Sequence, residues 1–259
     1  MDDKILLKQV RENPMVLESI KEPSIDLIKT AVKKNGIAIK FVAEPSFELK
    51  REAIKSNPLS IEFIENLEEE LGLLAVKLLW NSLKLIKNPS YEIQREAIST
   101  KGWAIQYVEK PTEELCLLAV NRDYDAIKYI EAPSKEVQLA SVKNSWNAIK
   151  YIKKPTLEIK RKAIIQNEEA IHFIASYDID ELKIFIEDNI KIVKYLYDSM
   201  EIELVLEVLN KKLEKDDFTE DYMRDFLELE ILEMDKIDFV NVYGSKRVKK
   251  LLVDYKLSK

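Results

Sequence analysis

The sequence is poor in the residues on which disulfide-stabilised, metal-binding and flexible proteins depend. Its 259 residues include one cysteine, one histidine and four glycines. A single cysteine cannot form an internal disulfide, which fits a reducing compartment. Four glycines are far too few for a collagen-like or flexible chain, and a hydrophobic content of 46% argues against disorder.

Long apolar runs and arginine are scarce as well. No stretch of about 18 apolar residues occurs, so we expect no membrane-spanning helix. The first eight residues carry two acids and no apolar signal segment, which predicts a cytoplasmic protein. Only seven of the 41 basic residues are arginine, and isoleucine and asparagine are abundant. This composition is typical of AT-rich genomes, such as those of low-GC bacteria and their phages.

What the sequence does contain is a repeat of 22 residues, and a period of this length is the signature of repeat architectures. We number the repeats from 1 (1–22) to 9 (177–198) and count positions within each from 0, the place of a proline. Position 1 is Ser or Thr after each proline, position 3 is acidic from Asp26 to Asp180, and positions 8 and 9 mostly read Ala-Val or Ala-Ile. Repeat 4 (67–88) departs from the pattern, with Leu67 in place of proline. The prolines are Pro23, Pro45, Pro89, Pro111, Pro133 and Pro155.

The pattern predicts two short helices in each repeat. Proline followed by Ser or Thr starts a helix and supplies a capping oxygen, and the acid at position 3 faces the positive end of the helix dipole. The first helix should run to about position 11, with positions 4, 8 and 9 apolar. The second should cover positions 14 to 20, with positions 15, 16, 18 and 19 apolar. Helices this short are marginal alone, so their apolar faces must be buried against neighbouring repeats.

We therefore predict an all-α fold, a right-handed α-solenoid of nine helix-pair repeats in residues 1–198 with a mostly helical C-terminal cap in 199–259. A globular helical bundle is the alternative. Within the cap, residues 199–235 carry 13 acids and 4 bases, whereas residues 236–259 are basic. Ile237 to Tyr243 alternates weakly and is interpreted as a strand or an extended turn.

The Pro-Ser-x-Glu start and the Ala-Ile-x-Tyr-Ile motif of residues 126–130 and 148–152 resemble short α/α repeats of bacterial and phage proteins, HEAT-like in style. The resemblance covers about residues 1–198. It implies an interaction scaffold and not an enzyme.

Four candidates for chemistry have structural explanations instead. His172, at position 17, should face water and has no second imidazole with which to bind a metal. Cys116 should be half-buried in its helix, with no histidine nearby to activate it. The acids at position 3 should lie about 10 Å apart in neighbouring repeats, too far to share a metal. The helix start at residues 244–247 lacks the glycine spacing of a phosphate-binding loop. We expect no enzymatic activity, no cofactor and no metal site.

The candidate partner surface combines leucines with aromatic residues. Position 6 is leucine in repeats 4, 6 and 7, and by helical angle it points about 200° away from position 4, towards solvent. Aromatic residues at positions 13 and 14, at the corner between the two helices, either pack between adjacent corners or anchor a partner at an edge. Gly72 lies inside a helix of repeat 4, where it costs about 1 kcal/mol relative to alanine and indicates a local weakness. The predicted partner-binding residues are Leu73, Leu117, Leu139, Trp80, Trp103, Tyr124 and Trp146.

These features predict a protein-binding scaffold. In one specific version, a phage protein binds and inhibits a defence protein in the cytoplasm of its host. The C-terminal segment or a second copy of the chain is another way to cover the leucines. Nucleic-acid binding through the lysines of position 17 is the alternative function, although Glu62 and Gln106 interrupt them and the repeats are almost neutral overall.

Overall fold

The computed structural model describes residues 3–258, and every regular element within that range is a helix. The predicted start of repeat 1 at Met1 lies outside the described residues. The chain divides into two compact units, the first ending at Val137 and the second beginning at Gln138. The division falls inside helix α7 (Lys135–Asn144), and each unit is described by itself.

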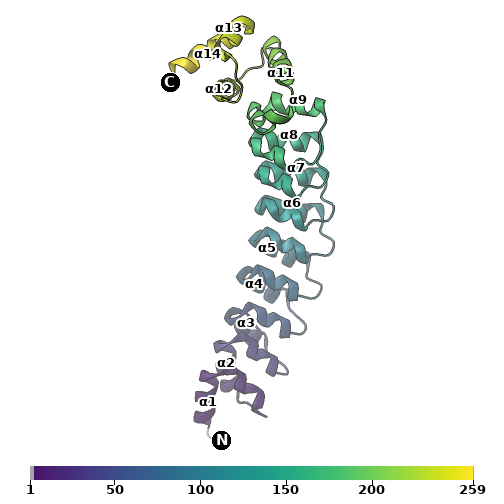
Figure 1. Cartoon of the computed structure of the whole chain (residues 1–259). Helices are drawn as coiled ribbons and strands as arrows, with labels where there is room; N and C mark the ends of the chain where they lie inside the picture. The colour runs from purple at the N-terminus through teal and green to yellow at the C-terminus, as the bar shows by residue number, and fades with distance from the viewer. Residues whose placement is uncertain (1–2, 259) are drawn as a thin grey trace. The chain divides into compact units, whose positions relative to one another are not determined.

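The first unit consists of helix pairs that follow one another in chain order (Figure 1). In each pair an α-helix of ten residues is followed by a 3-10 helix of six residues, so the all-α repeat architecture of an α-solenoid is confirmed. The bounds are α1 (Asp3–Glu12), η1 (Pro14–Ser19), α2 (Ile25–Lys34), η2 (Gly36–Phe41), α3 (Phe47–Ser56), η3 (Pro58–Phe63), α4 (Glu69–Leu78), η4 (Trp80–Leu85), α5 (Tyr91–Thr100), η5 (Gly102–Tyr107), α6 (Glu113–Arg122) and η6 (Tyr124–Tyr129).

The second unit continues the pairs and then changes pattern. Its repeat helices are η7 (Trp146–Tyr151), α8 (Leu157–Gln166), η8 (Glu168–Phe173), α9 (Ile179–Asp188), η9 (Ile190–Ile192), α10 (Val193–Leu196) and η10 (Tyr197–Ser199). The remaining helices are α11 (Ile202–Glu214), α12 (Glu220–Glu228), α13 (Lys236–Tyr243) and α14 (Lys246–Leu257). The predicted strand or extended turn at Ile237 to Tyr243 is therefore wrong. Asp235 caps that helix by accepting a hydrogen bond from the Asp238 amide at 2.8 Å, and Phe239 is buried beneath it.

The helix starts follow the predicted capping chemistry. Ser24 accepts a hydrogen bond from the Leu27 amide at 3.4 Å, and at the corner Asn35 accepts one from the Ile37 amide at 3.1 Å. Whereas in repeat 9 the short 3-10 helix η9 is followed by α10, in repeats 1 to 8 the second helix differs from its prediction, because it is a 3-10 helix over positions 13 to 18 and not a longer helix over 14 to 20. The corner cap fixes its start, and an extended residue such as Val42 ends it.

The core of each repeat lies between the two helices and the next repeat. Ala31 and Val32, at positions 8 and 9, are fully buried, as the pattern predicts. A Cβ atom at Gly36 would overlap the carbonyl oxygen of Ala53 in the next repeat. Glycine therefore lets η2 approach the following α-helix closely in repeat 2.

The C-terminal helices pack against the last repeat. α11 contacts α9, and α12 contacts η9. The Tyr222 hydroxyl donates a hydrogen bond to the Ile186 carbonyl at 3.0 Å, and burial raises the pKa of this tyrosine. Phe218 and Phe226 complete a buried aromatic cluster around Tyr222. These apolar side chains cover the end of repeat 9, which no further repeat follows.

Candidate functional site

The three leucines of position 6 are not fully exposed to solvent. Leu73, Leu117 and Leu139 are all half-buried, in α4, α6 and α7, so the prediction of an exposed leucine row is wrong. Arg51 occupies position 6 of repeat 3 and is half-buried as well. Lys29, Arg95 and Arg161 at the same position are exposed, so position 6 does face solvent, and the leucines and Arg51 are partly covered.

Gly72 also has a different role from the one predicted. It is buried, and a Cβ atom there would lie 2.5 Å from the Cδ1 atom of Ile93 in the next repeat. Glycine at this position lets α4 and α5 approach closely, so it is a packing feature and not only a helix-weakening one.

Three of the aromatic residues at positions 13 and 14 pack between adjacent repeats, but against rings of position 18 and not against the adjacent corner. Tyr124 lies at the start of η6 and is half-buried. In each pair the second ring comes from position 18, the last residue of a 3-10 helix. The pairs, with the distance between ring centroids, are Trp80 with Tyr107 (6.1 Å), Trp103 with Tyr129 (6.3 Å) and Trp146 with Phe173 (6.3 Å).

The rings of position 18 are a surface that the sequence analysis missed. The pattern placed position 18 in the buried stripe, but several of these rings are 37% to 41% exposed, because the chain leaves the 3-10 helix at this residue. The signal was the tyrosine of the Ala-Ile-x-Tyr-Ile motif, a ring with a polar end among aliphatic residues. We call these residues the aromatic row. They are Phe41, Phe63, Tyr107 and Tyr129 in the first unit, and Tyr151, Phe173 and Tyr195 in the second.

Lysines of position 17 lie over this row. The Lys40 ammonium is 4.7 Å from the centroid of the Phe41 ring, and the Lys150 ammonium is 4.3 Å from that of Phe173. A cation at this distance is attracted to the negative face of an aromatic ring. Ring and cation therefore occur together in several repeats, with interruptions where position 17 is Glu62 or Gln106.

Trp103 packs against Tyr129 of the aromatic row and makes several polar contacts of its own. Lys101 and Lys128 lie 4.6 and 4.3 Å from the centroid of its ring, and its indole N–H donates a hydrogen bond to Asp125 at 2.7 Å. Burial acts to raise the pKa of Asp125, but hydrogen bonds from Lys128 and Trp103 outweigh it and hold the pKa below its usual value. The carboxylate therefore stays charged and fixes both neighbours.

The other candidates contribute to folding. His172 is exposed, as predicted, and its ring contacts Tyr195 edge-on at 4.5 Å. Cys116 is 6% exposed, more buried than predicted, and burial raises the pKa of its thiol. Arg247 donates hydrogen bonds to the carbonyls of Asp216 and Phe218, so its guanidinium ties α14 to the segment between α11 and α12. In residues 3–258 no cluster of three or more potential metal ligands occurs.

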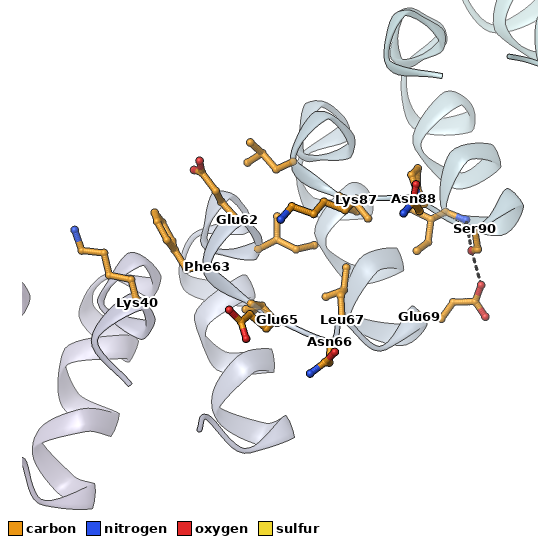
Figure 2. A pocket seen from close by; sticks show the side chains of 16 residues that line it. Lys40, Glu62, Phe63, Glu65, Asn66, Leu67, Glu69, Lys87, Asn88 and Ser90 are labelled. Carbon is orange, nitrogen blue, oxygen red and sulfur yellow. Dashed lines mark hydrogen bonds between the residues drawn. The ribbon is translucent and has the colours of Figure 1, made fainter. Parts of the chain in front are cut away.

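The first unit contains a groove of about 820 Å³ beside repeat 4 (Figure 2). Phe63 borders it on one side, and Leu67 and Leu85 lie where other repeats have a proline and a ring. Asn66 and Asn88, in the two linkers that flank repeat 4, have left-handed backbone angles of φ 47° and 48°. The groove therefore lies beside a repeat that departs from the pattern at Leu67 and at Leu85.

Comparison with family models, curated proteins and solved structures found no match. Over the described part of the chain, no helix has the length and apolar character needed to cross a membrane.

Proposed function

We propose that this chain is a non-enzymatic scaffold that binds another protein through the aromatic row and its lysines. The supporting observation is the recurrence of an exposed ring with an ammonium over it, as in Lys128 with Tyr129 and Lys150 with Phe173. Exposed aromatic side chains supply large contact areas at protein interfaces, and a repeated surface extends such an interface over several repeats.

The charges around the row favour a protein partner over a nucleic acid. Lys128 is paired with Asp125 at 2.8 Å, and Lys194 is paired with Glu168 at 2.8 Å. An ammonium that is paired with a carboxylate attracts a phosphate less strongly, because the carboxylate repels that phosphate. Nucleic-acid binding remains the second candidate, since single strands also stack on exposed rings beside lysines.

The composition suggests a setting for this scaffold. In this setting the chain is encoded by a phage and its partner is a defence protein of the host. Binding takes place in the host cytoplasm without a cofactor. Self-association through the same row is the competing way to cover its rings.

The test compares capture of a partner by wild-type protein and by matched variants. Phe63→Glu together with Tyr151→Glu changes one exposed ring in each unit, whereas Ile165→Glu with Ile179→Glu changes exposed apolar residues of the α-helices. Binding should weaken at least about tenfold in the first variant and stay unchanged in the second, as expected for interface hot spots. Equal capture by both variants would place the binding surface elsewhere.

Two further measurements separate the alternatives. Retention of single-stranded DNA that falls steeply with salt would favour the nucleic-acid function. Concentration-dependent mass in sedimentation, lost in the ring variant, would favour self-association.

A further inference from the structure

The aromatic row has a gap in repeat 4. Position 18 carries Phe63 in repeat 3 and Tyr107 in repeat 5, but Leu85 in repeat 4. Leu85 lines the groove of about 820 Å³, and so does Phe63, which is 38% exposed. The groove thus lies where the pattern of the other repeats would place a ring.

Within the described residues, the lysine of the same repeat contacts no ring. In repeats 2 and 6 the ammonium of position 17 lies 4.7 and 5.0 Å from the centroid of the ring that follows it in the chain, as Lys40 does with Phe41 and Lys128 with Tyr129. Within residues 3–258, Lys84 makes no ion pair, hydrogen bond or ring contact. A ring at the level of Leu85 would meet an unpaired cation on its face, which is the charge complementarity of a cation–π contact.

We propose that the groove beside repeat 4 binds one aromatic side chain of a partner polypeptide, which completes the aromatic row. The inserted ring would lie next to Phe63 and above Leu85, and Lys84 would take the place that Lys40 has over Phe41. This inference rests on the proposed function, because it treats the row as the binding surface and names the anchor point on it.

The charges that face the groove favour an uncharged ring over an anion. Lys40 and Lys87 line it together with Glu62, Glu65 and Glu69, and in Figure 2 the Glu69 carboxylate accepts a hydrogen bond from Ser90. Opposite charges of similar number leave little net attraction for a phosphate. The contacts that the groove itself leaves for an occupant are the apolar floor and the exposed ring of Phe63, and Lys84 is the residue directly before the lining residue Leu85.

The experiment uses the full chain and small probes. N-acetyl-tryptophanamide, N-acetyl-leucinamide and adenosine monophosphate are titrated separately and followed by saturation-transfer NMR. The tryptophan probe should bind saturably in the millimolar range and more tightly than the leucine probe. Leu85→Tyr supplies the missing ring from the chain itself and should abolish this binding. Leu78→Tyr, at an exposed residue of α4 outside the groove, is the matched control and should leave binding unchanged.

Lys84→Gln keeps the groove open and is the second variant, in case Leu85→Tyr does not fold. It should weaken binding of the tryptophan probe about two- to fivefold, the range of an exposed cation–π contact. Equal binding of tryptophan and leucine probes, unchanged binding in Leu85→Tyr, or tighter binding of adenosine monophosphate would each overturn the proposal. Partner capture that needs the row while the tryptophan probe does not bind would reject the anchor point and leave the scaffold function standing.

Discussion

A buried lysine in the second unit gives the sharpest test of how neighbouring repeats hold together. Lys160, at position 5 of repeat 8, is only 9% exposed. Its ammonium donates hydrogen bonds to the Ser176 carbonyl at 2.8 Å and to the Glu181 carboxylate at 2.8 and 3.1 Å. Ser176 lies in the linker after repeat 8 and Glu181 in α9, so one side chain ties two repeats.

Lys160→Met keeps the apolar stem and removes the ammonium. Hydrogen bonds to charged groups contribute about 1.5–3 kcal/mol, and removing one member of a fully buried ion pair costs about 3–5 kcal/mol. The Glu181 side chain is 22% exposed, so water would compensate part of its lost partner. We therefore expect the free energy of unfolding to fall by about 2–3 kcal/mol.

Urea and thermal denaturation followed by circular dichroism measure this loss. Lys162→Met is the control on the same helix, because Lys162 is exposed, and it should change stability by less than about 0.5 kcal/mol. A double-mutant cycle with Glu181→Gln should give a coupling energy of at least about 1 kcal/mol. Equal effects of Lys160→Met and Lys162→Met, or a coupling near zero, would refute the reasoning.

Two other predictions concern glycine and pH. Gly102→Ala should lower the free energy of unfolding, measured by urea denaturation, by at least about 2 kcal/mol, because the added Cβ atom would overlap the Ala119 backbone oxygen. Gly72→Ala should be nearly neutral, because only the flexible end of the Ile93 side chain must move. Equal losses in the two variants would contradict this reasoning. The pKa of Asp125 is lowered in the folded protein. The carboxylate therefore contributes its full stabilisation at pH values above the ordinary aspartate pKa of about 3.9, and this stabilisation is lost only as the pH falls through the lower pKa of the folded state. The indole N–H resonance of Trp103 should therefore stay constant from about pH 7 to 4, and a midpoint above about pH 4 would show that the carboxylate is not held.

The repeat was predictable because its chemistry is local. Proline and a capping hydroxyl such as Ser24 act within a few residues, so the sequence predicts where the first helix of a repeat begins. The second helix begins at position 13, one residue before its predicted start, where Asn35 caps it in repeat 2. The buried pair Ala31 and Val32 follows from the same phase.

The surface was less predictable because it depends on contacts between repeats. Whether Leu73 is covered depends on the next helix in the stack, and one helical wheel does not include that neighbour. The exposure of Phe63 follows from where the 3-10 helix ends, and the pattern did not distinguish a 3-10 helix from a longer helix. Lys160 is buried only because Glu181 comes from the following repeat, which no single repeat contains.

Repeat 4 shows how such contacts replace local signals. It lacks the proline, and neither Glu68 before α4 nor Leu79 before η4 makes a side-chain capping bond. Lys50 of repeat 3 compensates, since its ammonium lies 3.2 Å from the Glu68 carboxylate and 3.5 Å from the Glu65 carbonyl. The backbone amide of Glu68 and then Lys50 lower the pKa of that carboxyl, so the link is charged at neutral pH. Because a neighbouring repeat supplies this support, repeat 4 can depart from the pattern on the face that borders the groove and still keep its place in the stack.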